Sequence, residues 1–276
     1  MTAVVCAGLA TRDTIWRVPG HPPEDGRVVA SELLVAGGGP AATAAVALAR
    51  LGVETAFLGA VGDDDAGAFV RDGLAAEGVD VSRLEVVAGA STAQSAILVG
   101  PAGARTIVHH SGSAVAPRAP APNCDWLHVD HCGYGQIAGE ARLSVDGGNP
   151  IEGLALAGVD LYAPTEAALH TQFGDGPAAI AAGAELVVVT RGAAGSSAWT
   201  QAGETFETPG VPCANAVSTL GAGDVFHGAL LAFLVRGAPL PDALRAANTA
   251  ASLSCRALDG RSAIPTLHEL ERSLAA

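Results

Sequence analysis

Lysine is absent from this 276-residue chain, and all 15 of its basic residues are arginine. A Walker A loop needs a lysine on the phosphates of its nucleotide, and Schiff-base chemistry needs a lysine amine. The absence of lysine therefore excludes both kinds of site. If the chain binds nucleotide phosphates, it must use backbone amides, helix N-termini, arginine and a metal ion.

Cysteine pairs, positive charge and long apolar runs are also missing. The five cysteines are an odd number without a CxxC pair, which indicates reduced thiols. The net charge of −13 argues against nucleic acid or an anionic membrane as a partner. No uncharged apolar run approaches the ~18 residues of a membrane span, and no basic region precedes the apolar start of the chain. We therefore expect a cytoplasmic protein without a secretory signal.

Short apolar runs rich in valine, isoleucine and leucine alternate with alanine-rich helical stretches. This alternation predicts an α/β fold with a parallel, doubly wound sheet. The predicted strands of that sheet are Val4–Gly8, Thr55–Val61, Trp126–Asp130, Leu143–Asp146, Leu161–Ala163, Leu186–Thr190 and Ser196–Thr200. The predicted helices are Ala41–Leu51, Gly67–Glu77, Glu166–Gln172, Pro177–Ala182, Asp224–Arg236, Pro241–Arg256 and His268–Ala276.

Two stretches predict strands with no helix between them. They lie within residues 14–36, with a strand at Val28–Val35, and within residues 91–110, where Gly100-Pro101-Ala102-Gly103 indicates a hairpin turn. We expect these strands to form a separate small β layer. Because no linker or repeat interrupts the sequence, we expect residues 1–276 to form a single domain. The segment Gly133–Leu143 is short for a crossover helix.

The segment Ser218–Asp224 (STLGAGD) runs directly into a predicted helix and carries the clearest chemical signal. The small residues Gly221, Ala222 and Gly223 would present their amides at the helix N-terminus, where the helix dipole favours an anion. Asp224 would lie in the first helical turn. Beside an anion pocket its carboxylate could accept a proton from a hydroxyl that attacks phosphorus. A simple acidic cap after a glycine turn is the alternative.

A second glycine-rich segment, Ala36–Thr43, precedes a predicted helix. Its residues Gly37, Gly39 and Ala42 satisfy the dinucleotide pattern G-x-G-x-x-A, with an acidic residue following at Asp63. The Rossmann pattern normally follows the first strand, however, and here a strand and a long segment come before it. Pro40 also removes one amide from the loop. A nicotinamide-dependent oxidoreductase stays open as a hypothesis.

A metal site is a further alternative. His128, Asp130 and Cys132 alternate along one predicted strand and so share a face, and three other histidines could join them. Those histidines are His109, His110 and His131. Residues of this kind on a buried strand also commonly pack and form hydrogen bonds.

The two glycine-rich segments together resemble the two signatures of the ribokinase-like (PfkB) family of carbohydrate and nucleoside kinases. The first segment, with Gly52 and Gly62, matches the N-terminal signature in spacing, and Ser218–Ala229 matches the C-terminal one. The resemblance extends from about residue 4 to residue 270. Further matching segments are Gly8–Asp13, Phe57–Asp65, Arg105–Ile107, Thr190–Gly195 and Gly260–Thr266.

The resemblance implies a fold and a set of roles. The fold would be a central, mostly parallel sheet flanked by helices, with a small β lid, and ATP with Mg²⁺ would donate the phosphoryl group. Asp224 would be the general base, and the amides of Gly221, Ala222 and Gly223 would form the anion hole. The remaining implied residues are Asp13, Gly38, Gly39, Thr43 and Arg105 for the substrate, Thr190, Gly192, Gly195 and Asn248 for the nucleotide, and Glu166 for Mg²⁺ through water. A homodimer through the lid is also implied.

Three positions depart from the family pattern. Thr43 stands where asparagine is usual, and Ser218 stands where aspartate is commoner, near a monovalent-cation site of some members. Of the Asn-x-x-Glu element, only Glu166 is present. We expect a kinase acting on a sugar or sugar derivative. A nucleoside kinase of the same fold and a sugar- or nucleotide-binding protein without turnover remain alternatives.

Overall fold

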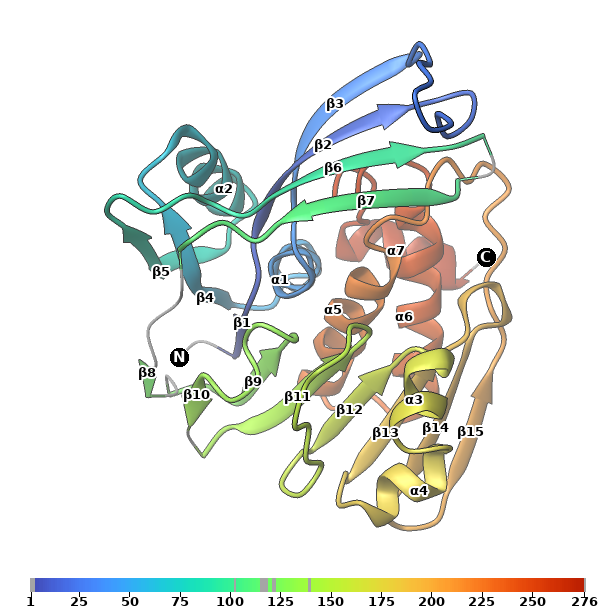
Figure 1. Cartoon of the computed structure of the whole chain (residues 1–276). Coiled ribbons are helices and arrows are strands. Elements are labelled where there is room, and N and C mark those ends of the chain that lie inside the picture. Colours follow the sequence, from blue (N-terminus) through green and yellow to red (C-terminus); the bar gives the residue numbers. More distant parts are fainter. Residues whose placement is uncertain (1–2, 102, 115–118, 121–122, 139, 276) are drawn as a thin grey trace.

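A nine-stranded sheet forms the centre of the computed structural model, which describes residues 3–101, 103–114, 119–120, 123–138 and 140–275 (Figure 1). The strand order is β15-β14-β13-β12-β11-β9-β1-β4-β5. All pairs from β13 to β5 are parallel, and β14 and β15 extend the sheet antiparallel. The strands are β1 (Val4–Ala7), β4 (Thr55–Gly62), β5 (Asp80–Val87), β9 (Trp126–Val129), β11 (Arg142–Gly147), β12 (Leu161–Pro164), β13 (Leu186–Thr190), β14 (Ser196–Thr200) and β15 (Thr205–Thr208).

Helices cover both faces of this sheet, which explains why its central strands are apolar on both sides. One face packs on α1 (Pro40–Arg50), α2 (Asp65–Ala76), α5 (Ala222–Val235), α6 (Leu240–Ser254) and α7 (Leu267–Ala275). The other face packs on α3 (Glu166–Gln172) and α4 (Gly176–Ala181). Small residues let α1 and α5 approach closely, because a Cβ at Gly228 would lie 2.6 Å from the carbonyl oxygen of Ala44. The many alanines of α1 thus serve helix packing.

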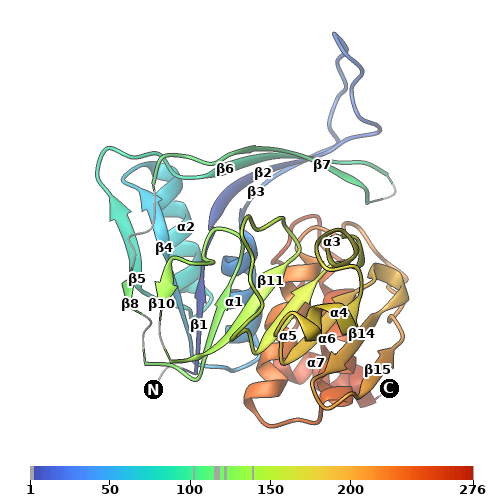
Figure 2. The same ribbon diagram turned by 60° about the horizontal axis from the view of Figure 1, so that its bottom comes forward.

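A second, four-stranded sheet extends over the carboxyl ends of the parallel strands, and we call it the lid (Figure 1). Its order is β3-β2-β6-β7, in which two antiparallel pairs are joined by a parallel β2–β6 contact. Its strands are β2 (Thr11–Arg17), β3 (Glu32–Gly38), β6 (Gln94–Val99) and β7 (Arg105–His110). The connection between β2 and β3 projects away from the body (Figure 2). Ile15, Ile97 and Leu258 join the lid to the body in a small apolar cluster.

The predicted class of fold is confirmed, and the differences lie in edge elements. The strand expected at Val28–Val35 is found at Glu32–Gly38. The two edge strands of the main sheet, β5 and β15, were not predicted. The side chains of β5 are mostly exposed, and those of β15 alternate between exposed and half-buried, so neither strand carries an apolar run. Between β9 and β11 the described residues form no helix, only the short β10 (Ile137–Ala138), which pairs with β8 (Ala119–Pro120). Among the described residues, no helix combines the length and the apolar character that crossing a bilayer requires.

Candidate active site

The predicted site residues gather at one edge of the main sheet, under the lid. Asp13 and Gly38 lie in β2 and β3, at the root of the lid. Glu166 follows β12, Thr190 ends β13, and Asp224 lies in the first turn of α5. Ligands of open α/β sheets bind outside the carboxyl ends of the strands, which is where these residues converge.

The N-terminus of α5 is open to a ligand. Its N-cap residue, Gly221, adopts the left-handed conformation with φ of 73°, and no side chain of the described residues caps the helix. A side chain at Gly221 would also bring its Cβ within 2.8 Å of the Gly260 Cα. Glycine is therefore required here. In the first turn beside it, the Ala222 amide donates a long hydrogen bond of 3.3 Å to the Thr219 carbonyl, and the Gly223 amide follows it. Uncapped amides at a helix N-terminus suit a phosphate group.

The carboxyl group of Asp224 has a raised pKa. Burial and the nearby carboxylate of Asp146 raise its pKa from 3.8 to about 7, against the opposing effect of His227. Asp130 also raises this pKa, and Arg105 lowers it. A carboxylate that gains and loses a proton near neutral pH suits general base catalysis.

Asp13 is a buried carboxyl group on the lid strand β2. It accepts a hydrogen bond of 2.7 Å from the Thr11 hydroxyl. Burial raises the pKa of Asp13, while hydrogen bonds from Thr11 and Ser95 act in the opposite direction. Gly38 leaves room for this carboxylate, because a Cβ there would lie 1.9 Å from Asp13 Oδ2. Gly39, with φ of 91°, begins α1 and closely approaches the Leu9 carbonyl.

Arg261 is a site residue whose role the sequence did not reveal. Its buried guanidinium donates from Nε to Thr43 Oγ1 at 3.2 Å and from Nη2 to the Gly38 carbonyl at 2.7 Å. Burial lowers the pKa of Arg261 to about 10, against the attraction of Asp13 and Asp224. The threonine at position 43 is thus the hydrogen-bond partner of an arginine that both aspartates attract electrostatically. The only sequence signal for it is the Gly260-Arg261 pair after the last long helix.

Asp130 organises the loops around the pocket. Its Oδ2 accepts hydrogen bonds from the amides of Leu9 and Ala41, at 2.8 and 3.1 Å. Its Oδ1 accepts two more, from the amides of Cys132 and Gly133. Because all four bonds come from backbone amides, this carboxylate fixes the start of α1 and the segment that follows β1.

The structure divides the predicted metal ligands between two groups. Within the described residues, Asp130 and Cys132 lie with His131, and His128 lies with Asp146 and His227, the ligand atoms of each group being within 4.8 Å of one another. His128 lies 3.0 Å from Ser144 Oγ through Nδ1, and Asp130 is engaged with the backbone. The two exposed lid histidines, His109 and His110, lie on β7 instead.

The residues predicted to bind the nucleotide lie beyond Asp224 along the same edge. Thr190 forms a parallel bridge with Thr165, which precedes Glu166. Gly192 and Gly195 have positive φ in the turn that follows β13. The side-chain amide of Asn248 on α6 donates to Ser196 Oγ at 3.0 Å, so it connects α6 to β14.

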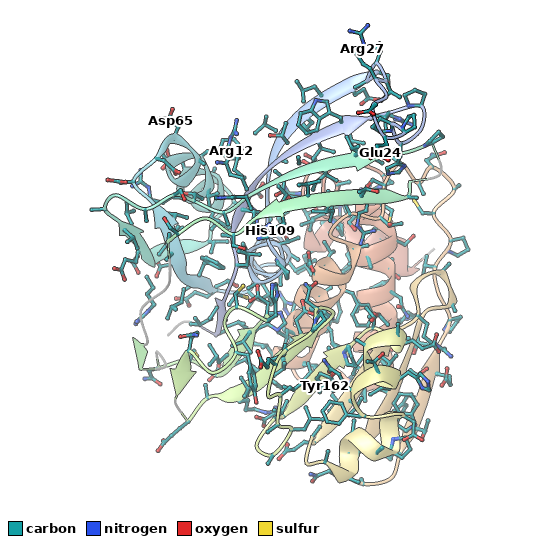
Figure 3. All side chains as sticks on the ribbon, in the orientation of Figure 1. Arg12, Glu24, Arg27, Asp65, His109 and Tyr162 are labelled. Carbon is teal, nitrogen blue, oxygen red and sulfur yellow. The ribbon has the colours of Figure 1, made fainter. Side chains whose placement is uncertain are left out.

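The lid reaches the anion site through Arg105. Its Nη1 donates to Thr219 Oγ1 at 2.9 Å, just before the glycine turn of α5. Nearer the lid root, a cavity of about 510 Å³ opens between the body and β7. His109 lies at the carboxyl end of β7 (Figure 3). It lines this cavity together with His131 and Cys132.

The dinucleotide hypothesis is not supported. The glycines of Ala36–Thr43 connect the lid strand β3 to α1 and do not follow β1, the first strand of the parallel sheet. The predicted acidic partner, Asp63, accepts a hydrogen bond from the Gly89 amide at an exposed turn.

Comparisons with known proteins agree with this geometry. The model of the pfkB family of carbohydrate kinases matches residues 1–159 and 155–267. An ATP-dependent ribose-1-phosphate kinase of Halopiger xanaduensis is 29% identical over 95% of both chains. A fructokinase of Klebsiella pneumoniae is 31% identical over 88% of this chain and 93% of its own. The structure of Arabidopsis thaliana ribokinase with ribose and ATP aligns with a TM-score of 0.83 over 100% of this chain and 99% of that one, at 22% identity. The chain thus belongs to the pfkB family of carbohydrate kinases, the ATP-dependent sugar and nucleoside kinases of the ribokinase fold.

Proposed function

We propose that this protein transfers the γ-phosphoryl group of ATP to a hydroxyl of a small sugar or sugar derivative, with Asp224 as the general base. The observation that carries the proposal is a carboxylate with a pKa of about 7 in the first turn of a helix whose N-terminus is uncapped. The base and the anion site would then lie together in the first turn of α5.

The acceptor would lie between the lid and α5. Asp13 would accept hydrogen bonds from sugar hydroxyls, and Gly38 and Gly39 would let the sugar approach the backbone. Arg261 would hold Thr43 and the Gly38 carbonyl in place around it. One acceptor hydroxyl would then point at Asp224, which removes its proton as the oxygen attacks phosphorus.

The amides of Gly221, Ala222 and Gly223 would stabilise negative charge on the transferring group. Such stabilisation is worth about 3–4 kcal/mol per donor where it has been measured in acyl transfer. Arg105, tied to Thr219, would bring the lid's positive charge to the same place. Closing the lid over the sugar would also exclude water, which limits hydrolysis of ATP.

The nucleotide would bind along Thr190, Gly192, Gly195 and Asn248. Glu166, exposed at the first position of α3, would hold Mg²⁺ through a water. One carboxylate suffices, because Mg²⁺ keeps several waters and takes its other ligands from the phosphates. Mg²⁺ would supply charge neutralisation of the phosphates. The serine at position 218 provides no carboxylate for a monovalent cation.

A nucleoside is the second candidate acceptor. The cavity of about 510 Å³ beside the lid root offers space beyond the sugar hydroxyls, lined by His109 and His131. A substituent on the sugar could enter this space.

ADP release with Mg·ATP tests the proposal against a panel of ketoses, aldoses, sugar acids, phosphosugars and nucleosides. We expect turnover with one acceptor class, and a loss of several powers of ten in Asp224→Ala. His268→Asn, an exposed change on α7, serves as the matched control. ATP binding without turnover on any acceptor would support a binding protein, and no ATP binding would refute the kinase assignment.

We also propose that residues 1–276 act as one unit and that two copies pair through their lids. Leu33 and Val108 expose apolar side chains on the lid at 64% and 68%. Light scattering should give a dimer that Val108→Asp converts to a monomer. A monomeric wild-type protein would contradict this pairing.

A further inference from the structure

A buried ion pair lies beside the proposed base. His227 Nδ1 is 3.2 Å from Asp146 Oδ2, and both side chains are about 5% exposed or less. His227 follows Asp224 by three residues on α5, so the two side chains lie on one face of the helix. Asp146 reaches the same place from the carboxyl end of β11.

Neighbouring residues fix this pair in place. Asp146 Oδ1 accepts a hydrogen bond of 2.7 Å from the Gly148 amide, which turns Oδ2 toward His227. His128 on β9 stands opposite Ser144 in the sheet register and lies 3.0 Å from its hydroxyl. The ring of His128 is 5.8 Å from that of His227. The pair is therefore enclosed by the sheet on one side and α5 on the other.

The pair carries two opposite charges. The neighbouring imidazoles lower the pKa of Asp146 to about 2, despite its burial. Asp146 and Asp224 raise the pKa of His227, against the effect of burial. His128 stays neutral, because burial and the positive charge of His227 lower its pKa to about 4. Asp146 is thus ionised at neutral pH, and its carboxylate favours the protonated form of His227.

Five charged groups act on Asp224 from the elements around it. They are Asp146 from β11, His227 from α5, Asp130 from the loop after β9, Arg105 from β7 and Arg261 from the segment after α6. Among these, Asp146 has the largest effect and His227 the next, with opposite signs. These two side chains serve no other contact of the proposed mechanism.

We propose that His227 and Asp146 are positioning residues of this kinase, a buried ion pair that sets the pH range over which Asp224 is ionised and able to accept the proton of the acceptor. The proposal rests on the assignment of Asp224 as the base. Neither residue touches the acceptor or the nucleotide in this scheme. A purely structural pair would change stability and turnover without moving the pH profile.

The test compares the acidic limb of the kcat/KM pH profile in wild type, His227→Asn and Asp146→Asn. Without His227, the negative charge of Asp146 is no longer offset and raises the pKa of Asp224 further. The acidic limb should therefore move to higher pH by about one unit. At pH values below the pKa of Asp224, a shift of one unit lowers kcat/KM about tenfold, because tenfold less of the base is ionised. Removing Asp146 takes away the larger effect and also favours neutral His227, so the limb should move to lower pH. Shifts in opposite directions are the expected result, and equal or absent shifts would overturn the proposal.

The double variant His227→Asn/Asp146→Asn removes both charges together, so neither single buried charge is left without its partner. Its limb should lie between those of the two single variants, and His268→Asn should match wild type. A double-variant limb outside that interval would overturn the proposal.

A measurement without turnover separates this inference from the proposed function. In ¹⁵N-histidine NMR of the substrate-free protein, His227 should titrate at a higher pH in wild type than in Asp146→Asn, because the Asp146 carboxylate raises its pKa. A protein that shows this titration but phosphorylates no acceptor would refute the kinase mechanism alone. A His227 that titrates at the same pH in wild type and in Asp146→Asn would refute the ion pair, whatever the activity.

Discussion

Replacing Asp224 with asparagine should stabilise the folded protein at pH 8 while it removes phosphoryl transfer. The pKa of this carboxyl group is about 7 in the fold and 3.8 without it. Between these pH values the unfolded chain has released its proton and the folded chain has kept it, so the free energy of unfolding falls as pH rises. Because asparagine does not ionise, the Asp224→Asn protein does not undergo this loss of stability.

The magnitude follows from the shift of roughly three pH units. Each unit corresponds to ~1.4 kcal/mol, or about 4 kcal/mol for a fully buried group. The Asp224 side chain is partly accessible, and solvent screening reduces the expected gain to about 1–2 kcal/mol. For a chain of this length, that gain raises Tm by roughly 3–6 °C.

Calorimetry of wild type and Asp224→Asn from pH 4.5 to pH 8 measures this directly. The difference in Tm should be largest at pH 8 and shrink toward zero at pH 4.5. His268→Asn should show no pH-dependent difference from wild type. An Asp224→Asn protein that is no more stable than wild type at pH 8 would show that the fold does not raise the pKa of Asp224.

Three further substitutions test the pocket and the lid. Arg261→Lys keeps the charge but loses the two hydrogen bonds to Thr43 and Gly38, so we expect the acceptor KM to rise about tenfold, with the KM of ATP unchanged in steady-state assays. Gly39→Ala forces a side chain into a backbone with φ of 91° and should lower the free energy of unfolding by about 2 kcal/mol in urea titrations. Arg105→Gln should lower kcat about tenfold and leave Tm within about 1 °C, because this arginine lies on the exposed lid. A loss of stability in Arg105→Gln, or an unchanged acceptor KM in Arg261→Lys, would contradict these roles.

The sequence sufficed for the central parallel strands, the presence of the lid and the glycine turn before Asp224, because each depends on local patterns. Strand periodicity, alanine-rich helices and a STLGAGD turn are short-range features. Burial of Arg261 and the pairing of His227 with Asp146 join segments far apart in the chain. A histidine one turn into an apolar helix most often packs against its neighbours. Only the position of β11 beside α5 in the fold revealed Asp146 as the partner of His227.

Edge positions were least predictable for the same reason. Strand β5 carries charged residues at Asp80, Arg83 and Glu85 and pairs within the sheet with β4 alone, so its pairing depends on a neighbour that periodicity does not reveal. Thr43 looked like a weakened substrate contact, whereas the structure gives its hydroxyl a partner in Arg261.

Phosphorus-31 NMR of Mg·ATP with the best acceptor is the most direct test of the central claim, that Asp224 activates a hydroxyl for phosphoryl transfer. With wild type, the γ-phosphate signal should disappear as a phosphomonoester signal of the acceptor grows. With Asp224→Asn, the ATP signals should persist under the same conditions. Transfer by the variant at the wild-type rate, or release of inorganic phosphate in place of the phosphomonoester, would contradict the account.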